Sequence, residues 1–215
     1  MFDLDDTLIH STIDFIKLKR KTIDFYSSLG IPLDAFSPNM KTYEILQKAT
    51  SILRTKGLAP REISRIVEKT SHLWDQIELE NITAARAVDG AKDTLIHLKQ
   101  QNFVVGVVTR SSRPYALTSL ELTGLLAFID VIVARNESEK EKPEPDPLVQ
   151  AMKVVRSKAA ETIMVGDSIT DFYCSQNAGV RFVGVDRGND RFKALRRHAC
   201  ITIIRELSDL IALFT

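Results

Sequence analysis

The chain has 215 residues, of which 44% are hydrophobic and 27% are charged. This length and balance are typical of one large globular domain, or of a core domain with a small insert. The formal net charge is only +1, so the composition gives no electrostatic support for a nucleic-acid partner or an anionic membrane surface.

The two cysteines, Cys174 and Cys200, fall in different predicted elements and lack the spacing of metal ligands. We therefore expect no disulfide framework and a reduced, cytoplasmic setting. We also expect no signal peptide, because the first residues are acidic rather than basic and then apolar. No apolar run is long enough to cross a bilayer, so a membrane partner is not expected. The sequence leaves the oligomeric state open.

Two closely spaced acids stand near the start of the chain. Asp3 and Asp5 are two positions apart in the segment FDLDDTL, and residues two apart in a strand point to the same face. The carboxyl end of a parallel strand is where α/β proteins bind ligands. Two such carboxylates repel each other unless a cation lies between them or their pKa values are split. The segment thus predicts a hard-metal site, a nucleophile with a partner acid, or both. Only two residues precede Asp3, so we expect a short first strand.

Residues 11–87 carry long amphipathic runs and no β-rich run, which predicts an all-helical module. The first helix is expected to end near Gly30, the second to begin at Ser37-Pro38 and end near Gly57, and the third to open at Pro60. The apolar stripe of the first helix is expected to comprise Ile13, Phe15, Ile16, Leu18, Ile23, Phe25, Tyr26 and Leu29.

From Val88 onward, short apolar runs alternate with helical patterns. Asp89 is a candidate cap for the first helix of this part. Strands are predicted over residues 103–108, 128–133, 162–165, 182–185 and 201–204. Helices are predicted over residues 115–122 and 147–155, after Ser168, and over residues 192–197 and 207–214. This alternation indicates an α/β fold with a doubly wound, parallel sheet. Residues 1–10 and 88–215 then form the core domain, with residues 11–87 inserted after the first strand.

Three further polar clusters follow predicted strands. Thr109-Arg110-Ser111-Ser112 offers hydroxyl groups and a helix start that could bind phosphate oxygens. Lys142-Pro143 opens a proline-rich segment that could hold the lysine in place. Gly166-Asp167-Ser168 and Asp171 put two acids beside a helix N-terminus. Taken singly, Thr109 could cap a helix, Lys142 could be a solvated loop lysine, and Asp171 could complement a helix dipole. Their occurrence after successive strands favours one shared site.

These segments, in this order, resemble the motifs of the haloacid dehalogenase (HAD) superfamily, in its phosphoglycolate-phosphatase-like branch. The resemblance covers nearly the whole chain, with the helical insert corresponding to the family's cap and the remainder to its Rossmann-like core. Asp6 stands where many members have glycine, His10-Ser11 where many have an acid before serine, and Arg110 where asparagine is frequent. The matching residues are Asp3, Leu4, Asp5, Asp6, Thr7, Thr109, Lys142, Pro143, Gly166, Asp167, Ser168 and Asp171.

The resemblance implies a Mg²⁺-dependent phosphatase that hydrolyses a small phosphate monoester, similar to phosphoglycolate, through an aspartyl-phosphate. By that resemblance Asp3 is the nucleophile and Asp5 is the general acid and base. Mg²⁺ is expected on Asp3, Asp167 and the backbone carbonyl of Asp5.

The remaining residues of the motifs have supporting roles by the same resemblance. Thr109 and Lys142 are expected to bind the phosphoryl oxygens, and Arg110 to influence what binds near the phosphate. Asp171, with Ser168, is expected to orient the site or support the metal. The partner is therefore a small phosphorylated metabolite. Basic residues of the insert that could meet a second anionic group of the substrate are Lys17, Lys19, Arg20, Lys21 and Arg54, each of which could equally be part of a solvated helix face.

Several related activities are compatible with parts of the pattern. A haloacid dehalogenase or a phosphonate hydrolase is disfavoured, because those relatives lack the second acid and Asp5 is present. A phosphomutase of the β-phosphoglucomutase type keeps both acids and stays open. A non-catalytic binding module is a further alternative, against which the complete set of Asp3, Asp5, Lys142 and Asp167 argues.

Overall fold

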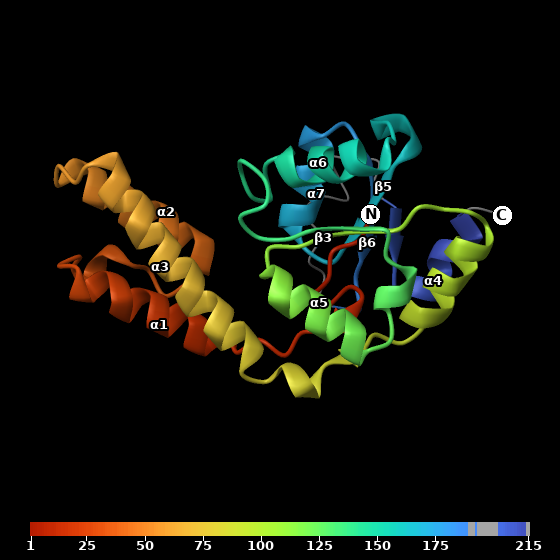
Figure 1. The fold of residues 1–215 in the computed structure, drawn as a ribbon, viewed down its shortest axis with the longest axis horizontal. Helices are drawn as coiled ribbons and strands as arrows, with labels where there is room; N and C mark the ends of the chain where they lie inside the picture. Colours follow the sequence, from red (N-terminus) through yellow and green to blue (C-terminus); the bar gives the residue numbers. More distant parts are fainter. Residues whose placement is uncertain (189–191, 193–201, 214–215) are drawn as a thin grey trace. The chain divides into compact units, whose positions relative to one another are not determined.

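The computed structural model of the chain describes residues 1–188, 192 and 202–213 (Figure 1). The chain divides into two compact units. One comprises Met1–Ser11 and Thr83–Thr215, and the other comprises Thr12–Ile82. The first unit is α/β and the second is all-helical, so the predicted α/β fold with a helical insertion is confirmed at the level of fold class. Among the residues that the structure describes, no helix is both long enough and apolar enough to span a bilayer.

The α/β unit is built on a parallel sheet in two parts that residues 1–3 join. Phe2 forms parallel bridges to Val107 on one side and to Val165 on the other. Its N–H donates to the carbonyl of Gly106 at 2.8 Å, and the N–H of Asp3 donates to the carbonyl of Val165 at 2.8 Å. The first strand is therefore short but central, and it ends at Asp3. The strands are β3 (Gly106–Val108), β4 (Val131–Val133), β5 (Ile163–Gly166), β6 (Arg181–Val185) and β7 (Thr202–Ile204), in the order β4, β3, residues 1–3, β5, β6, β7.

Helices cover this sheet through apolar contacts. Helix α6 (Asp146–Val155) packs against β3 and β4, and α7 (Ile169–Asn177) packs against β5 and β6. Helix α4 (Ala91–Gln100) packs against the 3₁₀ helix η6 (Leu207–Leu213). The core between β-strands, α6 and α7 includes Val108, Val133, Leu148, Ala151, Met152, Met164, Phe172 and Phe182. The other elements of the unit are α5 (Arg113–Leu122), the short helices η3 (Leu126–Phe128) and η4 (Ala159–Glu161), and the antiparallel pair β1 (Ile9–His10) and β2 (Arg86–Ala87).

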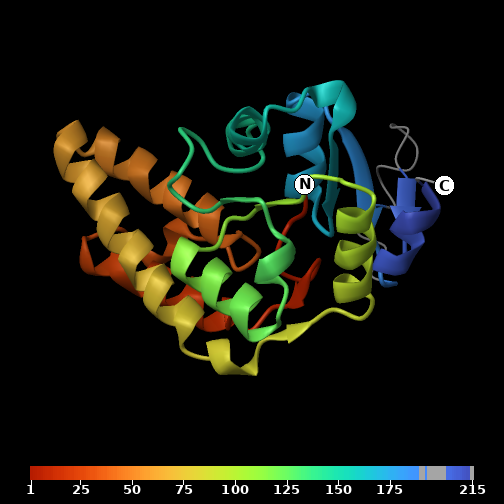
Figure 2. The same ribbon diagram turned by 45° about the vertical axis from the view of Figure 1, so that its right-hand side comes forward.

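The helical unit consists of three helices that lie side by side in both views (Figures 1 and 2). Two buried hydrogen bonds tie α1 to α3. The Tyr26 hydroxyl lies 3.0 Å from Thr70 Oγ1, and Trp74 Nε1 donates to Thr22 Oγ1 at 2.8 Å. The elements of the unit are α1 (Phe15–Ser28), α2 (Thr42–Thr55), α3 (Pro60–Leu79) and the short helix η1 (Leu33–Ala35), and the short helix η2 (Ile82–Ala84) begins at its last residue.

Several local predictions in the helical unit were wrong. Phe15 and Ile16 are 53% and 83% exposed, so they do not belong to the buried stripe of α1. The buried side chains of this helix are Leu18, Thr22 and Tyr26. Thr22 is buried because its hydroxyl donates to the Leu18 carbonyl at 2.7 Å and accepts from Trp74, which satisfies a polar group inside the core. An apolar periodicity alone could not place a threonine there.

Two predicted helix starts also differ from the structure. Ser37-Pro38 forms a turn, in which the Met40 N–H donates to the Ser37 carbonyl at 3.0 Å. Helix α2 begins only at Thr42, where the Glu44 carboxylate accepts from the Lys41 N–H at 2.7 Å. Asp89 does not cap α4; the cap position is Gly90, at a φ of 75° that favours glycine.

The first two strands predicted after Val88, over residues 103–108 and 128–133, are shorter in the structure. The apolar run 103–108 is a strand only over β3, and Val104 at its start is exposed. Residues 126–128 form η3 before β4 begins, and residues 207–213 are a 3₁₀ helix. The predicted helix over residues 192–197 lies outside the described residues except for position 192.

Candidate active site

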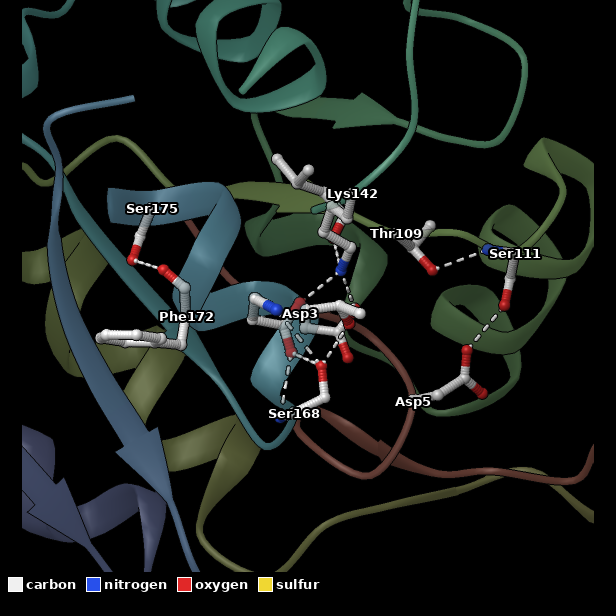
Figure 3. A network of polar contacts seen from close by, with 11 residues as sticks. Asp3, Asp5, Thr109, Ser111, Lys142, Ser168, Phe172 and Ser175 are labelled. Carbon is white, nitrogen blue, oxygen red and sulfur yellow. Dashed lines mark hydrogen bonds and ion pairs between the residues drawn. The ribbon is translucent and has the colours of Figure 1, made fainter. Parts of the chain in front are cut away.

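The predicted site residues of the α/β unit come from four segments that follow strands. Asp3 ends the central strand, Thr109 follows β3, and Asp167 follows β5. Lys142 lies in the segment between β4 and α6. Carboxyl ends of parallel strands share one edge of a sheet, and this edge holds the polar network drawn in Figure 3.

Lys142 is the centre of that network. Its Nζ donates to Asp3 Oδ1 and to Asp171 Oδ1, each at 2.6 Å, and to the Val108 carbonyl at 2.8 Å. An ammonium group has three N–H donors, so these three acceptors satisfy it completely inside the protein. Burial alone would lower the pKa of Lys142, but the carboxylates of Asp171 and Asp3 outweigh it and raise that pKa above its ordinary value. Lys142 is therefore a fixed positive charge.

Asp171 is held in place by the start of α7. Ser168 is the N-cap of this helix, and its hydroxyl donates to Asp171 Oδ2 at 2.6 Å. The Ser168 N–H donates to the same oxygen at 3.1 Å. A Cβ at Gly166 would lie 2.6 Å from the Asp171 carboxylate, so only glycine leaves room for this side chain. Asp171 is thus both a helix-capping acid and a partner of Lys142.

Three buried carboxylates form an acidic cluster. Oxygens of Asp3, Asp167 and Asp171 lie within 4.8 Å of one another. Burial raises the pKa of Asp3 well above its ordinary value, with Asp171 and Asp167 adding to the rise and Lys142 opposing it. Neighbouring carboxylates of this kind are stabilised in their charged form by a cation. An all-oxygen donor set fits a hard cation such as Mg²⁺, so these residues fit a metal site.

Asp5 has different partners. Its carboxylate accepts from the Ser111 hydroxyl at 2.7 Å and from the Tyr115 hydroxyl at 2.9 Å. In Figure 3 the Asp5 carboxylate is turned toward Ser111, whereas Asp3 lies beside Lys142. Reasoning from the sequence placed Ser111 in a phosphate-binding cluster and Tyr115 only in a helix, and it missed that both contact Asp5. The feature of the sequence that could have indicated this contact is the phenol of Tyr115 at the start of the helix that follows Thr109.

Thr109 is buried at the end of β3. Its N–H donates to the Val133 carbonyl at 3.0 Å, and its hydroxyl oxygen accepts from the Ser111 N–H at 3.0 Å. A threonine hydroxyl that accepts a bond in this way still has its proton to donate, as a phosphate oxygen would require. Arg110 is partly exposed, and its carbonyl accepts from Arg135 Nη1 at 3.1 Å. The structure leaves its predicted effect on ligand binding untested.

Two of the basic candidates in the helical unit have partners within that unit. Lys17 Nζ lies 2.6 Å from Glu80 Oε2, and Lys19 Nζ donates to the Pro38 carbonyl. In the α/β unit, burial raises the pKa of the Cys174 thiol to about 12, which keeps this cysteine in its neutral, unreactive form. Cys200 lies outside the described residues.

The fold and this site define an α/β enzyme with a buried lysine and an acidic cluster at the carboxyl edge of its sheet. The model of the haloacid dehalogenase-like hydrolase family matches residues 1–185. The chain belongs to this family. The predicted enzyme class, a hydrolase of the HAD phosphatase type, is confirmed at this level.

Known relatives cover nearly the whole chain. The pyrophosphatase PpaX of Bacillus pumilus is 36% identical over 214 residues, which are 99% of this chain and 94% of that protein. A predicted phosphoglycolate phosphatase from Haemophilus somnus matches 100% of this chain and 96% of its own, with a TM-score of 0.64 and 19% identity. The magnesium-bound HAD-hydrolase YfnB of Bacillus subtilis matches 99% and 96%, with a TM-score of 0.58 and 20% identity. At these identities the two solved structures support the fold alone.

Proposed function

We propose that the protein is a Mg²⁺-dependent phosphatase that hydrolyses a small phosphorylated compound through an aspartyl-phosphate on Asp3. The observation that carries this proposal is the buried contact of Lys142 with Asp3 and Asp171, beside Asp167. A carboxylate nucleophile must meet an anionic phosphate, and fixed positive charge at the same point reduces their repulsion.

The acidic cluster is suited to hold the metal. Asp3, Asp167 and the backbone carbonyl of Asp5 are the assigned ligands, with Asp171 adjacent to them in the cluster. When bound, Mg²⁺ supplies positive charge that offsets repulsion between the Asp3 carboxylate and the substrate phosphate. Hard oxygen ligands and a partly hydrated ion are the usual arrangement for this metal.

The reaction proceeds in two displacements at phosphorus. In the first, an Asp3 oxygen forms a bond to phosphorus while the bond to the leaving oxygen breaks, and Asp5 gives that oxygen a proton. In the second, water forms a bond to phosphorus, Asp5 takes a proton from the water, and the bond to Asp3 breaks to release phosphate. Asp5 ends protonated as it began, so the proton balance closes.

The remaining site residues bind the group that is transferred. The Thr109 hydroxyl is assigned to the phosphoryl oxygens as a donor. The Lys142 ammonium, whose three donors already have acceptors within the protein, is assigned to neutralise the charge of those oxygens, because both residues sit at the edge that carries Asp3. Arg110 is assigned a neighbouring position that influences the rest of the substrate. The helical insert, residues 11–87, is assigned the substrate-selecting role of a cap, as its resemblance to the family implies.

Inorganic pyrophosphate and phosphoglycolate are the first two substrates to compare. The 36% identity to the Bacillus pumilus pyrophosphatase over 99% of the chain favours pyrophosphate. Phosphoglycolate follows from the motif pattern. A phosphomutase would differ from both, because the phosphoryl group would pass to a sugar hydroxyl rather than to water.

The test is phosphate release from a panel that contains both compounds, with and without Mg²⁺. Parent and Asp3→Asn proteins are compared, with Asp93→Asn as a control because Asp93 is exposed in the first turn of α4. We expect Mg²⁺-dependent release by the parent and the control, and loss of release in Asp3→Asn. Acid quenching should trap one phosphoryl group on the peptide that contains Asp3. Equal release by parent and Asp3→Asn would remove Asp3 as the nucleophile.

A further inference from the structure

Two hydroxyl groups donate hydrogen bonds to the Asp5 carboxylate. Ser111 Oγ donates to Oδ2 at 2.7 Å, and the Tyr115 hydroxyl donates to Oδ1 at 2.9 Å. The two donors reach different oxygens, so together they fix the plane of the carboxylate and not only its distance. These partners lie 106 and 110 positions from Asp5 in the chain.

The backbone around the two donors is fixed by hydrogen bonds of its own. The Ser111 N–H donates to Thr109 Oγ1 at 3.0 Å, and its carbonyl accepts from the Arg135 N–H at 3.0 Å. Tyr115 lies in the first turn of α5, where its N–H donates to the N-cap hydroxyl of Ser112. The ring of Tyr115 is fully buried. Both hydroxyls are therefore held by the backbone of the turn after β3 and the start of α5.

This arrangement matters because Asp5 has to act on protons at a defined place. A carboxylate has about four acceptor positions, and each Asp5 oxygen accepts a bond from one of these two hydroxyl donors. Proton transfer is efficient only when the acid lies within hydrogen-bonding reach of the reacting oxygen. A freely rotating aspartate would meet that condition for only part of the time.

We propose that Ser111 and Tyr115 are positioning residues that orient Asp5 for proton transfer to the leaving oxygen. This inference rests on the proposed function, in which Asp5 is the general acid and base. Neither hydroxyl acts on the substrate; each acts through Asp5. The same turn thus carries Thr109 for the phosphate and Ser111 for the acid, so a single segment aligns both.

The dependence of kcat/KM on the leaving group of the substrate tests this positioning role. The 4-nitrophenolate ion leaves without needing a proton, whereas an alkyl alkoxide does need one. Values of kcat/KM are therefore compared for 4-nitrophenyl phosphate and for an alkyl phosphate, since this parameter covers the step in which the leaving group departs. We expect Tyr115→Phe to lower kcat/KM for the alkyl phosphate about tenfold more than for the aryl phosphate.

Substitutions of Ser111 provide a second test, in which a conservative variant is expected to restore the activity. Ser111→Ala should show the same selective loss, and Ser111→Thr, which keeps a hydroxyl at this position, should recover most of it. Asp5→Asn should show the largest selective loss. Ser119→Ala is the matched control, because it also removes a buried hydroxyl from α5, here bonded to the Ala116 carbonyl and not to Asp5. We expect this control to treat the two substrates as the parent does.

The outcomes separate this inference from the proposed function. A selective loss in Asp5→Asn, with equal losses or none for both substrates in Tyr115→Phe and Ser111→Ala, would overturn the positioning role alone. An Asp5→Asn protein that hydrolyses the alkyl phosphate like the parent would overturn the proposed role of Asp5, and the inference would fall with it. Selective losses in Tyr115→Phe and Ser111→Ala, rescued by Ser111→Thr, support it.

Discussion

The Lys142 ammonium and the Asp3 carboxylate come from positions 139 residues apart and lie 2.6 Å apart in a buried ion pair. Taking both charges out of water is costly, and only good geometry and further hydrogen bonds offset that cost. The Val108 carbonyl and Asp171 supply those bonds. The contact therefore makes the stability of the α/β unit depend on the same residues as the proposed chemistry.

Removal of the lysine should destabilise the fold. Lys142→Ala leaves the buried carboxylates of Asp3 and Asp171 without their cation, which costs about 3–5 kcal/mol for pairs of this kind. Urea denaturation, followed by circular dichroism, measures the change in the free energy of unfolding. Added Mg²⁺ should return part of the lost stability, because a cation would again lie among the carboxylates.

An exposed ion pair gives the matched control. Lys99 Nζ lies 2.6 Å from Asp130, but both side chains are about one-third exposed. Lys99→Ala should change the free energy of unfolding by less than about 1 kcal/mol, since water screens such pairs. If Lys142→Ala were no more damaging than Lys99→Ala, the buried network would have no special role in stability.

Mg²⁺ should stabilise the protein more at about pH 8 than at about pH 5. The pKa of Asp3 is raised by burial and by Asp171, so between its ordinary pKa and its folded pKa this group binds more protons in the folded state than in the unfolded state. The contribution of Asp3 to stability is then present below its ordinary pKa and falls as the pH rises toward its folded pKa. A metal requires the ionised carboxylate, so it competes with that proton.

Differential scanning fluorimetry at the two pH values measures this effect as the shift in Tm on adding Mg²⁺. At a metal concentration of about 100 times Kd, the stabilisation at the higher pH should be about 2.7 kcal/mol. Asp167→Asn should reduce the shift, whereas Asp93→Asn should not. A shift that is equal at both pH values and unchanged in Asp167→Asn would argue against the acidic cluster as the metal site.

Gly166→Ala should displace the Asp171 side chain and thereby disturb the site. The new Cβ would lie 2.6 Å from Cβ, Cγ and Oδ2 of Asp171, a side chain that Lys142 and Ser168 hold fixed. We expect a loss of about 1–3 kcal/mol, as for overpacked cores, together with weaker Mg²⁺ binding.

The control for this substitution is Gly57→Ala. Gly57 has a φ of 86° and no atom within 4 Å of an added Cβ, so this change adds backbone strain of about 1 kcal/mol without a clash. Calorimetric titration with Mg²⁺ on both variants separates the two effects. Unaltered Mg²⁺ affinity in Gly166→Ala would mean that the position of Asp171 has no influence on the metal.

Local patterns in the sequence determined the alternation of strands and helices, the all-helical insertion and the family. They succeeded because apolar periodicity and turn residues act over a few neighbouring positions. The same patterns failed where a distant contact decides burial. Ile16 is apolar yet exposed, and Thr22 is polar yet buried because Trp74 of another helix supplies its partner.

The tertiary structure alone decided how the motif residues divide between two networks. Asp3 and Asp5 are two positions apart in the chain, but Asp3 bonds to Lys142 and Asp5 bonds to Ser111 and Tyr115. These partners lie more than 100 positions away, and they meet the two acids only because parallel strands bring their carboxyl ends to one edge. The sequence by itself indicated which residues are candidates for the chemistry, and the packing of the sheet decided which of them touch.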